Sequence, residues 1–257
     1  MGATIVATDW LRVLRPEAGA LHQMLCFPPG GGTVSAYRSL AAKLGAGVAV
    51  AAVQYPGRQD RLSEPAIGDI GTLADRIAAQ VLGQGRVERL SLFGHSMGAT
   101  VAFETARRLE RAGQPVTTLF VSGRPAPTFI EPSRLHLASD DALIGDLERL
   151  ANDPASVAIL RDEPSLAELV LPAVRSDYQA VETYVYRDGD PLVGNIAVLV
   201  STEDPTVTPQ QASQWREHTR AGFADAVFPG GHFYLDEHVA DVAEFITATL
   251  ARAGGPA

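Results

Sequence analysis

Short apolar runs alternate with helical patterns along most of this 257-residue chain, and that alternation restricts the fold more than any other feature. The runs have the length of buried strands, and the patterns between them repeat apolar residues every three or four positions. Strand–helix alternation predicts an α/β fold, with a mostly parallel, doubly wound sheet covered by helices on both faces. The expected strands are 24–27, 48–53, 90–93, 118–122, 196–200 and 224–228, and the expected helices are 35–44, 70–82, 97–112, 209–218 and 239–251. A run at 10–14 predicts an additional antiparallel edge strand.

Composition and charge exclude several kinds of protein. With 46% hydrophobic and 20% charged residues, the chain resembles an ordinary soluble globule, expected to be one domain over residues 1–257. Its formal net charge of −9 argues against nucleic acid, since phosphate binding needs a basic face. We find no secretory signal and no apolar run of about 18 residues, so we expect no membrane association and a cytoplasmic location. The single cysteine, Cys26, permits no disulfide and is expected to pack inside a strand.

The pentapeptide Gly94-His95-Ser96-Met97-Gly98 joins an expected strand to an expected helix. A serine on such an elbow projects its hydroxyl away from the sheet, and the next residue offers a backbone N–H at the helix N-terminus. The flanking glycines have no Cβ and let strand and helix cross closely. We therefore expect Ser96 to be a nucleophile rather than part of a chance Gly-x-Ser-x-Gly loop.

The region 125–195 interrupts the strand–helix rhythm with helical patterns and no convincing strand. Asp-Pro at 153–154 and Asp-Glu-Pro at 162–164 are typical of helix ends and starts. Inserted helices after the nucleophile predict a lid over the active site, at about 127–193, whose residues contact the substrate. Extra packing on the sheet edge is the alternative. The apolar residues at helical spacing are Leu143, Leu147, Leu150, Leu166, Leu169 and Val170.

A serine nucleophile needs a base, and the base needs an orienting carboxylate. In α/β-hydrolases the acid and then the histidine follow the serine along the chain. His232 follows a Pro-Gly-Gly turn directly after an expected strand, where doubly wound sheets place their sites, and is the expected base. The other histidines are expected at a strand start, beside the nucleophile, in the lid or at solvated helix ends: His22, His95, His136, His218 and His238.

The acid is expected on the loop that follows the strand 196–200. Asp204 precedes Pro205, which favours an extended or turn conformation suited to a carboxylate aimed at an imidazole. Glu203 is the competing acid. Asp190 and Asp236 are weaker alternatives, because they lie before the strand and at a helix start.

Two backbone N–H groups are needed to stabilise the oxyanion of a tetrahedral intermediate. Met97 offers one, and Gly30, in the loop Phe27-Pro28-Pro29-Gly30-Gly31-Gly32, is expected to offer the other. We expect Pro29 and Gly31 of this loop to contact the substrate. The glycines do not form a phosphate cradle, since no Gly-Lys-Ser/Thr follows them.

Several motifs together resemble the type II (external, editing) thioesterases that accompany polyketide synthases and nonribosomal peptide synthetases. The resemblance covers nearly the whole chain, and its Tyr-Pro-Gly-Arg block is far more specific than the elbow. It rests on Cys-Phe-Pro-Pro-Gly-Gly-Gly at 26–32, Tyr-Pro-Gly-Arg-Gln-Asp-Arg at 55–61, the elbow, Ser-Gly-Arg-Pro-Ala-Pro at 122–127, Asp-Pro at 204–205 and Gly-Gly-His-Phe-Tyr at 230–234.

This resemblance implies an α/β-hydrolase fold with a helical lid and a triad of Ser96, Asp204 and His232. It implies hydrolysis, through an acyl-serine intermediate, of acyl groups from the 4′-phosphopantetheine arm of acyl or peptidyl carrier proteins, which clears stalled or mis-primed synthases. No metal and no bound cofactor are implied. Two positions depart from the family: Gly30 stands where alanine is common, and Ser201, where glycine is common, is expected to alter the turn carrying Asp204.

The related chain-terminating domains inside synthases generally carry their acid after the strand that follows the nucleophile helix. Here that strand leads into Ser122-Gly123-Arg124, and no carboxylate occurs before Glu131. This difference, together with a chain that begins at Met1 without a carrier domain, favours a stand-alone enzyme. We expect a monomer, since nothing in the sequence suggests an association helix. Small-molecule carboxylesterase or acyl-CoA thioesterase activity remains an alternative, as does a carrier-binding module without catalysis.

A carrier protein is usually acidic, and so is this chain, so local positive charge is needed for docking. Arg58 and Arg61 are expected to provide it, since their loop follows a strand at the end of the sheet where Ser96 lies. The alternative is that Arg58 only pins its own loop through Asp60 or a backbone carbonyl.

Overall fold

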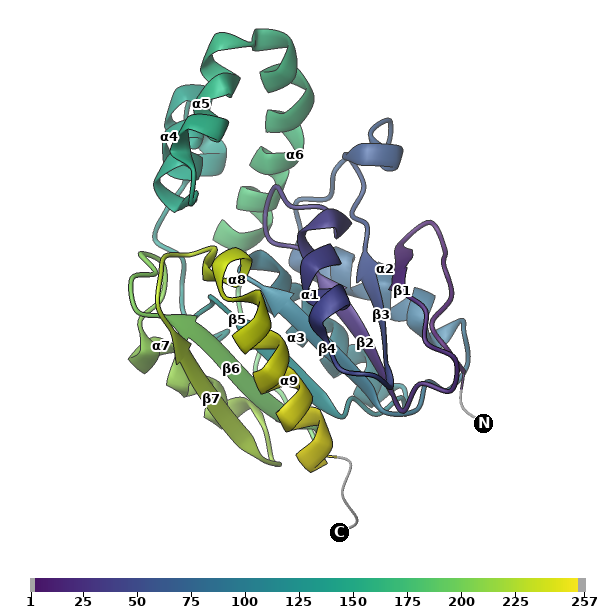
Figure 1. Cartoon of the computed structure of the whole chain (residues 1–257). Helices are drawn as coiled ribbons and strands as arrows, with labels where there is room; N and C mark the ends of the chain where they lie inside the picture. Colours follow the sequence, from purple (N-terminus) through teal and green to yellow (C-terminus); the bar gives the residue numbers. More distant parts are fainter. Residues whose placement is uncertain (1–2, 254–257) are drawn as a thin grey trace.

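A computed structural model describes residues 3–253 as an α/β fold built on a seven-stranded sheet of order β1-β3-β2-β4-β5-β6-β7 (Figure 1). Strand β1 pairs antiparallel with β3 at one edge, and every other pairing is parallel. The predicted sheet and its antiparallel edge strand are thus confirmed. The strands are β1 (Leu11–Arg15), β2 (His22–Phe27), β3 (Val48–Val53), β4 (Leu90–His95), β5 (Thr118–Ser122), β6 (Asn195–Ser201) and β7 (Phe223–Phe228).

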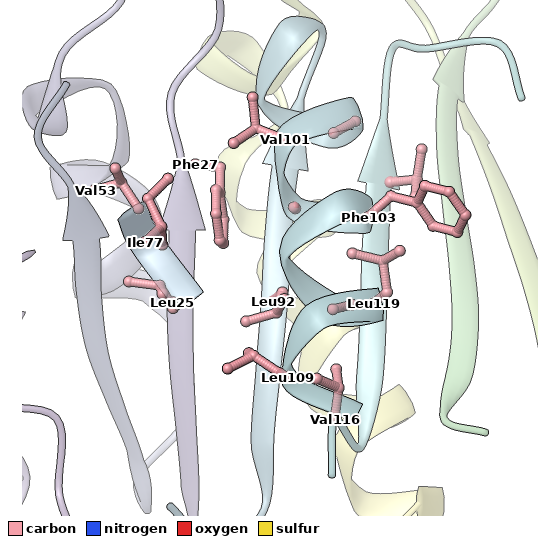
Figure 2. Close-up of a cluster of buried hydrophobic side chains, with 14 of the residues drawn as sticks. Leu25, Phe27, Val53, Ile77, Leu92, Val101, Phe103, Leu109, Val116 and Leu119 are labelled. Atoms are coloured by element: carbon pink, nitrogen blue, oxygen red, sulfur yellow. The ribbon is translucent and has the colours of Figure 1, made fainter. Parts of the chain in front are cut away.

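Helices cover both faces of the sheet. On one face α2 (Ile70–Leu82) and α3 (Met97–Arg111) share a core with Leu25 and Phe27 of β2, and Figure 2 shows Val101 and Leu109 of α3 within it. On the other face α1 (Arg38–Lys43) and α9 (Val239–Ala253) pack on alternate residues of β2, Met24 and Cys26. Because β2, β3 and β4 are buried on both sides, their sequences are mostly apolar and do not alternate between apolar and polar residues. Cys26 is fully buried and free, in the packing position expected of it.

The remaining short helices connect these layers. The expected helices at 35–44 and 209–218 each form as two pieces, one of them a 3₁₀ segment. No helix among residues 3–253 is long and apolar enough to cross a membrane. The short elements are η1 (Val34–Tyr37), η2 (Gln59–Arg61), α7 (Pro209–Ser213), η4 (Gln214–His218) and α8 (Tyr234–Glu237).

The segment between β5 and β6 forms the inserted helices predicted from the sequence. It contains η3 (Leu135–Leu137), α4 (Asp140–Leu150), α5 (Pro154–Asp162) and α6 (Pro164–Glu182). Figure 1 shows α4, α5 and the first half of α6 standing away from the sheet, beyond the carboxyl ends of its parallel strands. These helices have a small core of their own, centred on Leu143 and Val174. Of the leucines singled out above, Leu169 instead points outward, with 49% of its surface exposed.

Candidate active site

Ser96 lies on a strained turn between β4 and α3. Its backbone has φ 53° and ψ −123°, a conformation that costs a non-glycine residue roughly 1–3 kcal/mol. The two flanking glycines are sterically required. A Cβ on Gly94 would lie 2.3 Å from the carbonyl oxygen of Gly98, and one on Gly98 would lie 2.0 Å from that of Phe27. The second contact shows that Gly98 also lets α3 approach the glycine loop after β2.

His232 and Asp204 form a buried pair on the loops that follow β7 and β6. The Nδ1 of His232 lies 2.9 Å from the Oδ2 of Asp204, and the two side chains are 1% and 0% exposed. This contact leaves Nε2 of the imidazole as the nitrogen that can face a substrate. The pairing predicted from loop positions is therefore present in the structure.

Thr206 holds the Asp204 carboxylate in place, a function that the sequence analysis missed. The backbone N–H and hydroxyl of Thr206 donate to Oδ1 of Asp204 over 2.8 and 2.7 Å, so the other oxygen is left for His232. Burial alone would raise the pKa of Asp204, but hydrogen bonds and charge from His232, and hydrogen bonds from Thr206, bring it below the ordinary range. The carboxylate thus stays ionised. The Asp-Pro-Thr sequence, typical of a local side-chain-to-backbone turn, could have indicated this.

Ser96, His232 and Asp204 line one cavity of about 380 Å³ beneath the inserted helices. Pro29, Gly30 and Met97 line it as well. Within the described part of the chain the Ser96 hydroxyl makes no hydrogen bond. Catalytic hydrogen bonds are often long without substrate and tighten when it binds.

The N–H groups of Met97 and Gly30 are free to meet an oxyanion. Among residues 3–253 no group accepts a hydrogen bond from either of them, and Gly30 lines the cavity beside Ser96. The N–H of Gly31, in contrast, donates to Oδ2 of Asp177 on α6 over 2.7 Å. Gly31 lines a second cavity of about 420 Å³, which shares Pro29, Gly30, Leu147 and Phe233 with the first.

His95 lies behind the His232 imidazole, with the two ring centroids 4.8 Å apart. Burial, and then the charge of His232, lower the pKa of His95 to about 3, although Asp204 opposes this. His95 is therefore neutral at physiological pH and does not add a second positive charge beside His232. Its Nδ1 contacts the hydroxyl of Ser122, which in turn contacts the Tyr234 hydroxyl.

Among residues 3–253, none of the competing acids pairs with His232. Glu203 is exposed, Asp190 pairs with Arg220 at the surface, and Asp236 is exposed. The position after β5 is Gly123, where a Cβ would come within 2.7 Å of the His95 ring and 3.3 Å of the Asp204 carboxylate.

One expectation about the other histidines is wrong. His218 is not solvated, since it is only 6% exposed and packs among aromatic rings, including those of Phe103 and Trp215. Ser201 ends β6 and donates its hydroxyl to the carbonyl of Gly231 over 2.6 Å, and the expectation that it alters the turn carrying Asp204 stays a prediction. That bond ties the loop of the acid to the loop of the histidine.

The arginines expected to dock a partner are buried. Arg58 and Asp177 form a bidentate ion pair, with contacts of 2.6 and 2.9 Å and side chains 8% and 2% exposed. Arg61 is 5% exposed, donates to the carbonyl of Gln54 and stacks on Trp10.

The structure therefore contradicts the expected docking patch. The alternative for Arg58 holds in part. The side chain does pin its loop, but it does so through Asp177 and the carbonyl of Pro56, while Asp60 pairs with Arg12.

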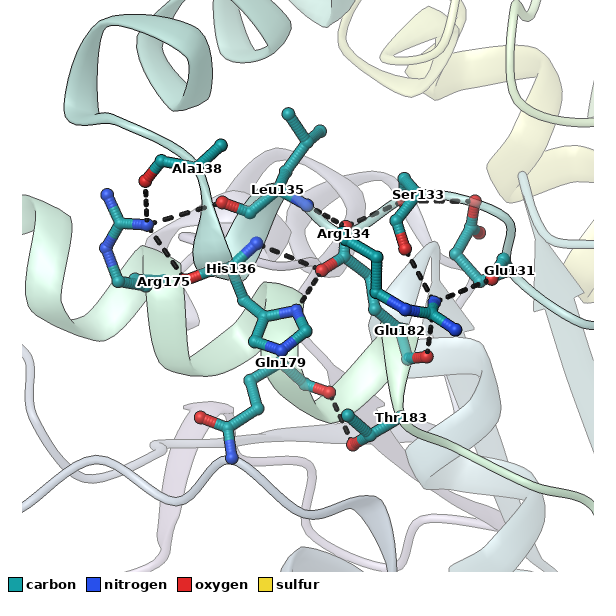
Figure 3. Close-up of polar contacts among 10 residues, drawn as sticks. All are labelled: Glu131, Ser133, Arg134, Leu135, His136, Ala138, Arg175, Gln179, Glu182 and Thr183. Carbon is teal, nitrogen blue, oxygen red and sulfur yellow. Dashed lines mark hydrogen bonds and ion pairs between the residues drawn. The ribbon is translucent and has the colours of Figure 1, made fainter.

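Glu182 and Arg175 of α6 attach the strap 131–138, which leads into the inserted helices (Figure 3). Glu182 accepts hydrogen bonds from the hydroxyl of Ser133, from the backbone N–H groups of Leu135 and His136, and from the His136 ring. Arg175 donates to three carbonyls of the same strap and pairs with Asp140 at the start of α4. Since Ser133 and Leu135 line the cavity, these two side chains shape its rim.

The Thioesterase domain family model matches residues 22–250. The chain belongs to the thioesterase family. It is 42% identical over 234 residues to a probable cadicidin biosynthesis thioesterase of Streptomyces griseus, with 91% of this chain and 63% of that protein covered. It is 37% identical to thioesterase PikA5 of Streptomyces venezuelae, with 94% of this chain and 85% of the relative covered.

Solved structures agree with this assignment. The type II thioesterase BorB from the borrelidin biosynthetic cluster superimposes with a TM-score of 0.86 at 40% identity, over 96% of this thioesterase and 100% of BorB. The likeness to type II thioesterases that the motifs indicated is confirmed, as is the fold. This chain spans less than two thirds of the length of the Streptomyces griseus relative.

Proposed function

We propose that this protein hydrolyses acyl thioesters carried on the phosphopantetheine arm of acyl or peptidyl carrier proteins, and so clears stalled or mis-primed polyketide or nonribosomal peptide synthases. The observation that carries the proposal is one cavity lined by the strained Ser96 and by the buried His232–Asp204 pair. The relatives named for cadicidin and borrelidin biosynthesis support the choice of substrate.

In this mechanism Ser96 Oγ attacks the thioester carbonyl while His232 Nε2 takes the hydroxyl proton. The Oγ–C bond forms, and the N–H groups of Met97 and Gly30 stabilise the oxyanion. Collapse breaks the C–S bond, and His232 gives its proton to the leaving sulfur. Water, deprotonated by the same imidazole, then attacks the acyl carbon. The C–Oγ bond breaks, the acid leaves, and His232 returns the proton to Ser96 Oγ. Asp204 holds the tautomer of the imidazole and stabilises its positive charge.

The inserted helices form the lid over this reaction. Leu147 and Leu150 of α4 line the cavity that contains Ser96, and Leu147, Leu166 and Val170 line the adjoining one. An acyl chain in either cavity would be covered by these side chains, while the carrier protein stays outside.

The test compares wild type with Ser96→Ala on three substrates that share one acyl group: an acyl-carrier protein, the acyl-CoA and a p-nitrophenyl ester. Loss of the nucleophile should reduce turnover by at least ~10³-fold on all three without unfolding the chain. A fluorophosphonate should label wild type at Ser96 only.

A higher kcat/KM for the carrier-bound substrate supports the proposed function. A higher value for the ester or for acyl-CoA would replace it with a small-molecule esterase or an acyl-CoA thioesterase. Near-normal turnover by Ser96→Ala would show that Ser96 is not the nucleophile.

A further inference from the structure

We propose that Asp177, on the inserted helix α6, is a positioning residue that holds the glycine loop of the oxyanion hole, with Arg58 as the counter-ion that makes this possible. The inference rests on the proposed function, because it concerns the same reaction. If the proposal is correct, the oxyanion hole forms only when α6 is packed against the glycine loop.

The glycine loop is a tight turn with little stiffness of its own. The N–H of Gly32 donates to the carbonyl of Pro29 over 2.9 Å, and Gly31, at the third position, has φ +69°. That geometry is typical of a type II turn, whose central peptide can flip at low cost when both central residues are glycine. Asp177 accepts the N–H of this central peptide over 2.7 Å and so fixes its orientation next to Gly30.

The positive charge of Arg58 offsets the negative charge that Asp177 brings into the cavity. Asp177 lines the same cavity as Ser96, so its bare carboxylate would oppose the negative charge that develops on the thioester oxygen. The guanidinium of Arg58 contacts both carboxylate oxygens and reaches Gly32's carbonyl at 3.4 Å. Burial would lower the pKa of Arg58, but the charge of Asp177 and its hydrogen bonds raise it above the usual range, so the guanidinium stays protonated. The Tyr-Pro-Gly-Arg block thereby acquires a function inside the active site.

Helix α6 packs directly on the loop. A Cβ placed on Gly31 would lie 3.2 Å from Val174, and one on Gly30 would lie 3.6 Å from the Cβ of Asp177. If α6 moved away, the acceptor of the Gly31 N–H would leave with it. The hole is therefore complete only when the lid helix is in place, and that links closure over the substrate to catalysis.

The decisive experiment compares two double variants that both remove the buried charges. Arg58→Met with Asp177→Asn keeps an amide oxygen to accept from Gly31, while Arg58→Met with Asp177→Leu does not. Replacing a buried ion pair by uncharged residues of similar size often leaves stability unchanged, so melting temperatures should allow a comparison of folded enzymes. The substrate is an acyl-N-acetylcysteamine thioester, which needs no carrier docking.

We expect kcat of the Leu variant to fall about 10–100-fold below that of the Asn variant, since a misplaced oxyanion donor costs up to ~10²–10³-fold. KM should agree within about twofold. Inhibition by a trifluoromethyl ketone, which forms an oxyanion on Ser96, should weaken by the same factor as kcat. Equal kcat in the two variants, within about threefold, would overturn the proposal.

Arg61→Met is the matched control, a buried arginine of the same loop that does not touch the glycines. It should lower stability and leave kcat unchanged. If either double variant fails to fold, hydrogen exchange of the backbone amides in the wild type tests the proposal instead. The Gly31 N–H, which donates to Asp177, should exchange much more slowly than the Gly30 N–H. Equal exchange would overturn the proposal. An active Ser96→Ala variant would instead refute the proposed mechanism, which separates the two failures.

Discussion

Replacing Glu182 by glutamine should loosen the strap 131–138 that leads into the inserted helices. In the folded chain each carboxylate oxygen accepts from one backbone N–H and one side chain: Oε1 from Leu135 and Ser133, and Oε2 from the backbone and ring of His136. A glutamine turns one of these oxygens into an NH₂ group that faces two donors. The serine hydroxyl or the imidazole can reorient, but the backbone N–H cannot.

The loss of stability can be estimated from the number of backbone N–H groups that lose their acceptor. One backbone N–H that loses its acceptor costs about 1–3 kcal/mol of unfolding free energy, so Glu182→Gln should lose about that amount. Glu182→Leu leaves both N–H groups without an acceptor and should lose roughly twice as much. Because Leu135 and His136 are only half-buried, water can replace part of each bond, which favours the lower end of both ranges.

Urea unfolding measures the change, and limited proteolysis locates it. The midpoint should fall at constant m-value, and cleavage within 131–138 should appear before cleavage elsewhere. Glu168→Gln, at an exposed position of the same helix, is the control and should change stability by less than about 0.5 kcal/mol. A Glu182→Gln protein as stable as this control, or one cleaved first elsewhere, would refute the reasoning.

The same substitution predicts a pH dependence. Burial would raise the pKa of Glu182, but the hydrogen bonds from Ser133, His136 and Leu135 lower it below its ordinary value of 4.5. A carboxyl group with a lowered folded-state pKa stabilises the fold above its unfolded pKa, and this contribution disappears as pH falls through the folded pKa. The stability difference between wild type and Glu182→Gln should therefore be full at neutral pH and shrink below about pH 4. A difference that stays constant down to about pH 3 would contradict this.

Two further predictions concern the cavity. Thr206→Val removes a hydrogen bond from the Asp204 carboxylate and should lower kcat about tenfold, because about 1.4 kcal/mol of orientation is lost. Thr202→Val, exposed on the same loop, should be silent, and equal kcat values for the two would show that Thr206 has no orienting function. Leu147→Phe, at the boundary of the two cavities, should reduce kcat/KM for long acyl chains while sparing acetyl, whereas the exposed Leu169→Phe should not. Uniform losses over all chain lengths would make Leu147 a packing residue only.

Much of this fold could be predicted from the sequence because its signals are local. The buried strands show as continuous apolar runs, and the elbow shows as glycines on both sides of a serine, where no Cβ could fit. The order of serine, acid and histidine, together with the positions of Asp204 and His232 on loops after expected strands, selected the pair that the structure brings into contact, because parallel strands bring the loops at their carboxyl ends together.

The positioning carboxylates were harder to recognise. Asp177 follows Val170 and Val174 and precedes Val181 at helical spacing, so a charged residue stands within an apolar stripe. That pattern was the available signal for a buried, paired acid, and it does not identify the partner. Glu182 ends the same helix and looks like any solvated acid in the sequence.

By itself, the sequence determined the sheet, the elbow and the set of catalytic candidates, since strand and helix periodicity and turn chemistry act over a few residues. Only the tertiary structure decided what the charges do. From the sequence, Arg58 was interpreted as a docking residue, because its partner Asp177 lies 119 positions away on the inserted helix α6. A charged side chain can be buried only where the fold brings an opposite charge to it, because desolvating a charge without a partner is too costly. For Arg58, the pairing depends on the packing of α6 against the glycine loop and not on any local sequence pattern.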